Sequence, residues 1–177
     1  MAGQLIQVAN TLIESGSETQ IVQFQNSITT DDVYMLVGNN IQVGGAGGIC
    51  DINPMVNTTV NTDNDIAIAW INLNSTTTFQ KFANTPQTVW RVTDGMNVTP
   101  YATNFIMYLY NWNSSSDYSF ISMEVTSHTG TNLRGYQQGG VKKVTTSFNG
   151  IQINTNQIAG GGWQAGTQFT LYKQVGS

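Results

Sequence analysis

The sequence predicts an all-β fold, an antiparallel β-sandwich with jelly-roll-like connections. Apolar and polar residues alternate with a period of two in about ten stretches, as in strands that bury one face. Clusters of glycine and asparagine separate these stretches, and such residues favour turns. The three- and four-residue spacing of an amphipathic helix hardly occurs.

The alternating stretches give the expected strands in chain order. They are residues 4–8, 19–24, 33–37, 65–73, 88–92, 105–112, 118–126, 144–148, 150–154 and 168–175. Residues 65–73 have apolar side chains for both faces, which predicts a central strand. Residues 105–112 are also apolar on both faces, and we expect one of these faces to pack against another subunit. Short helical pieces are expected at 12–15 and 77–84.

Two dipeptides predict tight hairpin turns. Asn149-Gly150 lies between two short alternating stretches, and Asp94-Gly95 follows another. Both dipeptides favour the positive φ angles of two-residue hairpin turns. The glycine-rich run 44–48 predicts a flexible loop, because it lacks the Lys-Ser/Thr pair and the following helix of a phosphate-binding loop.

A length of 177 residues suits one domain with a sizeable core. We therefore expect a single jelly-roll-like β-sandwich domain over residues 1–177, in which residues 1–30 form either the first strands or an extended arm. The sequence has no internal repeat of fixed period. This argues against a propeller, a β-helix or a fibre shaft, which are built from self-similar units.

The composition argues against nucleic-acid and membrane partners. Charged residues make up 9% of the chain, and the net charge is -4 with six basic residues, whereas nucleic-acid binding needs clustered Lys and Arg. We interpret the only basic pair, Lys142-Lys143, as two solvated lysines at the start of a strand that protect an exposed edge. No signal peptide or membrane span is recognisable. We expect synthesis in a cytoplasm and no membrane contact.

Few residues suit catalysis or metal binding. Cys50 is the only cysteine and His128 the only histidine, which excludes an intrachain disulfide and a Cys/His zinc site. We interpret Cys50 as a small buried side chain and His128 as the end of a strand. The acidic groups Asp31-Asp32 and Asp63-Asn64-Asp65 suit turns better than acid-base catalysis or calcium binding. We therefore expect no enzyme activity, no cofactor and no metal.

Aromatic residues beside turns are the candidate interface. Those in or next to stretches rich in glycine, asparagine or serine are Trp112, Tyr118, Tyr136 and Trp163. Planar rings among amides and hydroxyls suit both protein interfaces and sugar stacking, and each ring also suits simple packing. Trp70 and Trp90 lie inside predicted strands and are expected in the core.

The end of the chain resembles a known family. A turn at Gly160-Gly161-Gly162 leads to the alternating segment Gly166-Thr167-Gln168-Phe169-Thr170-Leu171-Tyr172. This segment resembles the ending of small β-sandwich structural proteins of tailed phages, including cyanophages. Lys173 departs from that pattern, because such endings usually carry glycine there. The resemblance implies a protein of the virion surface.

The resemblance and the composition together suggest a capsid decoration, or cement, protein. Such a protein binds the outside of the assembled phage head and bridges subunits of the major capsid protein. We expect a homotrimer on the capsid surface of the virion, made in the host cytoplasm, because three weak contacts on one rigid unit act together. The alternative is a receptor-binding, lectin-like tail-tip domain that recognises a host surface glycan through Trp112, Tyr136 or Trp163.

Overall fold

The computed structural model is an all-β protein with two antiparallel sheets, which confirms the predicted sandwich. It describes residues 3–45, 47–74, 78–96, 101–128, 132–156 and 162–176. The strands are β1 (Gln4–Leu12), β2 (Ile21–Phe24), β3 (Tyr34–Ile41), β4 (Gly48–Val56), β5 (Thr59–Val60), β6 (Ile66–Asn74), β7 (Thr78–Gln87), β8 (Trp90–Met96), β9 (Thr103–Tyr110), β10 (Ser119–His128), β11 (Leu133–Lys142), β12 (Gly150–Asn154) and β13 (Gln168–Val175). The jelly-roll order of connections stays a prediction.

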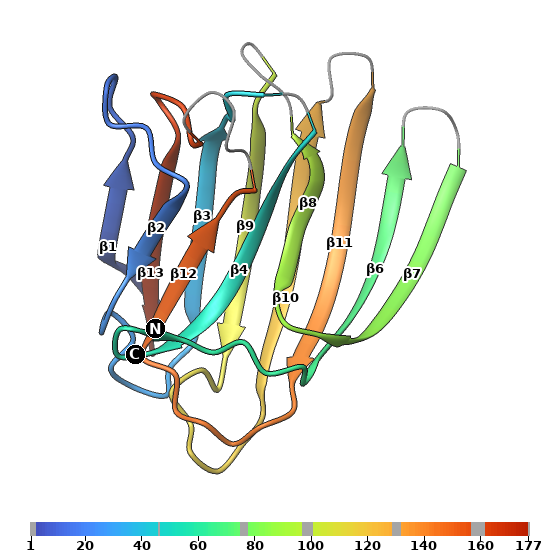
Figure 1. Ribbon diagram of the computed structural model, residues 1–177. Helices are drawn as coiled ribbons and strands as arrows, with labels where there is room; N and C mark the ends of the chain where they lie inside the picture. The colour runs from blue at the N-terminus through green and yellow to red at the C-terminus, as the bar shows by residue number, and fades with distance from the viewer. Residues whose placement is uncertain are drawn as a thin grey trace.

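The two sheets differ in size. The larger has eight strands in the order β1-β13-β3-β9-β10-β11-β6-β7, and the smaller has five, β2-β12-β4-β5 with β8 also paired to β4. Figure 1 shows the smaller sheet lying over one side of the larger sheet, with β6 and β7 extending past its edge. The larger sheet therefore has an inner face, mostly covered, and an outer face over which no second layer of the described residues lies.

Most predicted strands coincide with observed ones. Those at 4–8, 19–24, 33–37, 65–73, 88–92, 105–112, 118–126, 150–154 and 168–175 overlap β1, β2, β3, β6, β8, β9, β10, β12 and β13. The strand expected at 144–148 does not form. The helix expected at 77–84 is wrong from residue 78 onward, because this segment pairs with β6 as β7. Residues 12–15 are not helical either.

Neither predicted two-residue hairpin turn forms. Asp94 and Gly95 lie within β8, and Gly150 is the first residue of β12. The side chain of Asn149 instead joins loops that are distant in sequence, and its Nδ2 donates to Asn57 Oδ1 at 2.8 Å. Long-range hydrogen bonding at Asn149 has replaced the local turn.

The described glycines of the run 44–48 are held in the sandwich and do not form a free loop. Gly44 N–H donates to Gly162 O at 3.1 Å, and Gly47 N–H donates to Met96 O at 3.0 Å. Gly48 then begins β4. Residues 44, 45 and 47 thus form a loop that is tied to the sandwich, and its flexibility stays a prediction.

Three fully buried tryptophans lie in the core between the sheets. The ring centroids of Trp90 and Trp112 are 5.0 Å apart, and those of Trp112 and Phe148 are 5.9 Å apart. Trp163 meets Phe169 edge-on at 5.2 Å. Aromatic rings supply much of the buried apolar area of a core, so these contacts hold the two layers together. The burial of Trp90 confirms its predicted core position.

Two strand glycines let aromatic rings lie directly on the larger sheet. At Gly140 an added Cβ would lie 2.7 Å from Trp90 Nε1, and at Gly38 it would overlap the ring of Phe105, the cross-strand partner of Gly38. Glycine weakens a strand in general, but it is needed where a ring approaches the backbone this closely. The three glycines of β11 interrupt the alternation of apolar and polar residues. The periodicity of the sequence therefore did not predict this strand.

An ion pair connects β13 to the segment before β3. Lys173 Nζ lies 2.8 Å from Asp32 Oδ2, and Thr30 Oγ1 donates to the same oxygen at 2.6 Å. These hydrogen bonds, from Lys173 first and then Thr30, lower the pKa of Asp32. The bond to Asp32 raises the pKa of Lys173.

We predict that this ion pair stabilises the fold only between the pH extremes. The lowered carboxyl pKa gives stability that is present above the unfolded pKa of Asp, about 3.9, and is lost as pH falls through the folded pKa. The raised lysine pKa gives stability that is present below about 10.4 and is lost as pH rises through the folded pKa. Urea unfolding of Lys173→Met should show a small, salt-screened loss at pH 7 and none at pH 2. Lys143→Met, which removes an exposed lysine, is the control, and equal stability of both variants at pH 7 would contradict the prediction.

Candidate functional site

The outer face of the larger sheet presents a row of side chains across five strands. From β9 to β7 the register aligns Ile106, Glu124, Gln137, Ile71 and Lys81. Side chains alternate between the two faces of a strand, so residues aligned in this way share one face. The row mixes two apolar side chains with an acid, an amide and a base.

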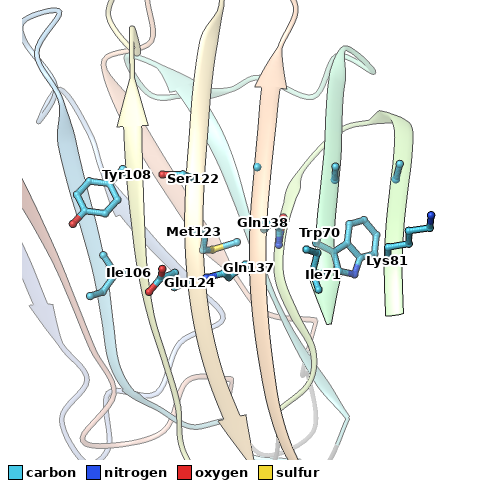
Figure 2. A pocket seen from close by; sticks show the side chains of 13 residues that line it. Trp70, Ile71, Lys81, Ile106, Tyr108, Ser122, Met123, Glu124, Gln137 and Gln138 are labelled. Carbon is cyan, nitrogen blue, oxygen red and sulfur yellow. The ribbon is translucent and has the colours of Figure 1, made fainter. Parts of the chain in front are cut away.

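The next outer row has small residues on four strands and forms the floor of a hollow. Its members from β9 to β7 are Tyr108, Ser122, Gly139, Ala69 and Ala83. The hollow has a volume of about 890 Å³ and spans all five strands, as Figure 2 shows. We call it the outer hollow, and it is lined by Ala69, Trp70, Ile71, Lys81, Ala83, Ile106, Tyr108, Ser122, Met123, Glu124, Gln137, Gln138 and Gly139.

Exposed apolar side chains gather in and beside the outer hollow. Ile71, Ile106 and Tyr108 are 47%, 41% and 37% exposed. Phe120, which is 43% exposed, pairs with Tyr110 in the adjoining outer row. Single exposed apolar residues are ordinary on a protein surface, but a contiguous group of them marks an interaction site. This face is therefore the strongest candidate for binding another molecule.

Two side chains of opposite charge lie among these apolar residues, Glu124 between Ile106 and Gln137, and Lys81 beside Ile71. Glu124 on β10 and Lys81 on β7 are separated in the row by Gln137 and Ile71. In the part of the chain that the structure describes, neither of the two forms an ion pair. A partner on this face would thus meet apolar side chains interspersed with one acid and one base available for pairing.

The inner face has a smaller hollow of about 110 Å³ beside β8. Trp70, Gln138 and Arg91 are among its lining residues. Trp70 was expected in the core, but it is only half-buried. The physical reason is that β6 and β7 extend past the smaller sheet (Figure 1), so their inner face has less cover. Arg91 is held by Asp51, with Nε 3.0 Å from Oδ1.

Three of the four aromatics expected at an interface are buried. Trp112 and Trp163 are fully buried and Tyr136 is nearly so, and Tyr136 lies within strand β11. Trp112 Nε1 donates to Gly150 O at 3.2 Å. These three side chains belong to the core, which corrects their expected surface position. Only Tyr118, at 47% exposed before β10, is on the surface.

The residues considered for catalysis or metal binding make contacts that are typical of structural residues. Cys50 is buried, and burial raises its pKa well above the usual value, so the thiol is a poor nucleophile. His128 ends β10, as expected, and its ring stacks on Tyr101 at 5.0 Å. Asp63 Oδ2 accepts a hydrogen bond from Asn61 Nδ2 at 2.9 Å within a loop. Among the described residues, no group of three or more His, Cys, Asp or Glu is placed to hold a metal ion.

The interpretation of Lys142-Lys143 as two solvated lysines is wrong for Lys142. This side chain is fully buried at the end of β11 and contacts the carboxylate of Asp65. Lys143 is exposed. Lys142 points inward because strand alternation places it on the inner face, in register with the buried residues Ser119 and Ile66.

One part of the outer hollow has a signal in the sequence. The stretch 105–112 is apolar on both faces, and this predicts that the side chains of Ile106 and Tyr108 need a partner. The lining residues on β11 and β7 could not be predicted in this way, because the sequence did not indicate these two strands. Only the register brings Gly139, Ala69 and Ala83 together.

The comparisons with known proteins give no relative. No protein-family model matches the chain, and no curated protein matches it. In the described part of the chain, the structure contains no helix with the length and apolarity needed to cross a membrane.

We predict opposite outcomes for two aromatic substitutions. Trp163→Ala should destabilise the fold by about 3–5 kcal/mol, because it removes a fully buried ring and leaves a cavity. Tyr118→Ala should change the free energy of unfolding by less than about 0.5 kcal/mol, because its ring is largely exposed. Thermal and urea unfolding of both variants measures this. A fully stable Trp163→Ala protein would show that this ring is not part of the core.

Proposed function

We propose that this chain is a capsid decoration protein of a tailed phage and that it binds the assembled head through the outer hollow. The observation that carries the proposal is the contiguous apolar surface of Ile71, Ile106, Tyr108 and Phe120 on an uncovered sheet face. The occupant is a surface segment of the major capsid protein.

The form of this surface favours a protein partner. It is broad and spans five strands, whereas sites for small molecules enclose most of the ligand. Interface centres are enriched in aromatic and apolar residues and depleted of charge. The outer hollow has this composition, with Glu124 and Lys81 as its only charged lining residues. Its two charges can fix the orientation of a partner by pairing at defined positions.

The ending of the chain supports a place in a phage particle. The segment 166–172, which resembles phage structural sandwiches, begins with Gly166 at a positive φ of 87° and continues into β13. The nearly chargeless composition also fits a protein that acts by contact. We further propose a homotrimer, in which three such faces bind the lattice of the head together and gain avidity.

The alternative, a lectin-like tail-tip domain, has less support. It relied on Trp112, Tyr136 or Trp163 as sugar-stacking rings, and all three are buried. A buried ring is not available to a glycan without unfolding its surroundings. The tail-tip function therefore has no site of its own among these residues.

The outer hollow allows a test that fills it without disturbing the fold. An added Cβ at Gly139 meets only Ile121 O, at 4.0 Å, so Gly139→Val fits the strand and raises its β propensity. We predict that this variant keeps its stability but binds phage heads at least about tenfold more weakly, a change of about 1.4 kcal/mol. Co-sedimentation with heads that lack the protein measures the affinity.

Thr126→Val is the matched control, because Thr126 is exposed on the same face of β10 but outside the outer hollow. It should bind heads as the unchanged protein does. Equal binding by both variants would mean that another surface makes the contact. Failure of the unchanged protein to bind heads, together with retention on host polysaccharide, would overturn the decoration function in favour of the tail-tip one.

A further inference from the structure

A lysine with no exposed surface lies at the end of β11. Lys142 is 0% exposed, and its cross-strand neighbours Ser119 and Ile66 are buried to the same extent. A lysine is almost never fully buried unless it is paired, because removing an ammonium group from water is unfavourable. Its contacts therefore require an explanation.

The amine of Lys142 is directed at one carboxyl group. Nζ contacts Oδ1 of Asp65, and it donates a hydrogen bond to the main-chain oxygen of Asp63 at 3.1 Å. The Asp65 side chain is only 16% exposed. Apart from this contact with Lys142, neither of its oxygens has a hydrogen-bond donor in the described part of the structure. The carboxyl group thus has Lys142 as its one close partner there.

The backbone holds the two groups in this position. Lys143 N–H donates to Asp65 O at 3.1 Å, and Asp65 N–H donates to Asp63 O at 2.9 Å. The first bond holds Asp65 beside the residue that follows β11, and the second fixes the local conformation of the segment that carries the carboxyl group. Ordinary ion pairs of flexible surface lysines lack this rigidity.

We propose that Lys142 and Asp65 are a covalent modification site and join as an isopeptide cross-link. The ammonium group of Lys142 gives a proton to the carboxylate, and the lone pair of Nζ attacks Cγ of Asp65. A bond forms between Nζ and Cγ, and one Cγ–O bond breaks. That oxygen leaves as water with two protons from the former ammonium group, and the amide keeps the third. The step needs no oxidant, reductant or co-substrate.

The site meets the conditions of this reaction. Fixed contact between two reacting groups corresponds to an effective concentration of about 10⁵–10⁸ M in favourable intramolecular cases. Burial keeps bulk water from solvating the charged pair and from hydrolysing the product. The remaining exposure of Asp65 is a way out for the water that is released. The amide that forms removes two buried charges, which relieves the unfavourable burial of the ammonium group.

The cross-link would connect β11 to the residue that precedes β6. A covalent connection across such a long loop stabilises mainly by restricting the unfolded chain, as a disulfide does. This chain has one cysteine, Cys50, and so has no intrachain disulfide. A lysine-aspartate amide gives the same restriction and is independent of the redox state.

Mass spectrometry of the denatured full chain tests the proposal. The unchanged protein should be lighter by about 18 Da, the mass of one water, than its sequence requires. Lys142→Arg and Asp65→Ala should show no deficit after correction for the substitution. These measurements do not require the variants to fold. A full mass for the unchanged protein would overturn the proposal and leave an ion pair.

Two controls make the result specific to this pair of residues. Cyclisation at Asp94-Gly95 also releases water, but it would persist in Lys142→Arg, and a deficit that persists there overturns the proposal. A cross-linked Lys142 resists trypsin. Asp65 lies in the tryptic peptide that ends at Lys81, and Lys142 lies between the cleavage sites after Arg134 and Lys143. Digestion of the cross-linked protein should therefore give residues 1–81 joined to residues 135–143. Separate linear peptides from these regions, with cleavage after Lys142, would contradict the cross-link.

Discussion

The structure depends on one geometric constraint. A strand presents alternate side chains to opposite faces, and among the described residues only one face of the larger sheet has a covering layer. The inner residues of β9, such as Met107, pack under the smaller sheet and are fully buried. Their chain neighbours Ile106 and Tyr108 must then point outward. Their side chains remain 41% and 37% exposed, so the fold of one chain buries them only in part. The outer hollow therefore suits the binding surface that we propose.

Close packing of aromatic rings on strand glycines is one of the contacts that hold the two sheets together. Trp90 lies against Gly140 and against Trp112, so one ring connects β8, β11 and the turn after β9. Glycine on β11 is thus used in two ways. Gly140 on the inner face admits Trp90, whereas Gly139 on the outer face forms part of the floor of the outer hollow. Adjacent glycines on one strand shape both faces of the sheet.

The fold class was predictable because strand periodicity is a local property of the sequence. The failures arose where contacts distant in sequence decide the structure. Trp163 lies among turn residues, yet its main-chain N–H donates to Thr19 O at 2.7 Å, and its backbone forms β-bridges with Thr19 and Val43. Such pairing buries the ring and has no local signal. Lys142 has the same explanation, since only the recognition of β11 places it on the inner face.

The candidate site was predictable only in part. The apolar stretch of β9 indicated an unsatisfied face, whereas the loop aromatics drew attention to residues that belong to the core. A tryptophan beside glycine and asparagine has the composition of a surface loop. Its large apolar area, however, favours burial wherever the chain can cover it. Most of the outer hollow comes from register between β10, β11, β6 and β7, which single-strand periodicity does not specify.

The Lys142–Asp65 contact joins β11 to the start of β6, and both strands also line the outer hollow. In Figure 1, β6 and β7 extend past the smaller sheet, so they have less cover than the other strands, although Ile66 and Ile68 at the start of β6 are buried. The same two strands provide Ile71, Ala83 and Lys81 to the outer hollow. On the proposed function this surface would transmit force between capsid subunits, and such a surface must be anchored to its own domain. Because Asp65 directly precedes β6 and Lys142 ends β11, a covalent connection between them would tie the buried start of β6 to β11, and through β6 it would support β7 at the edge of the sheet.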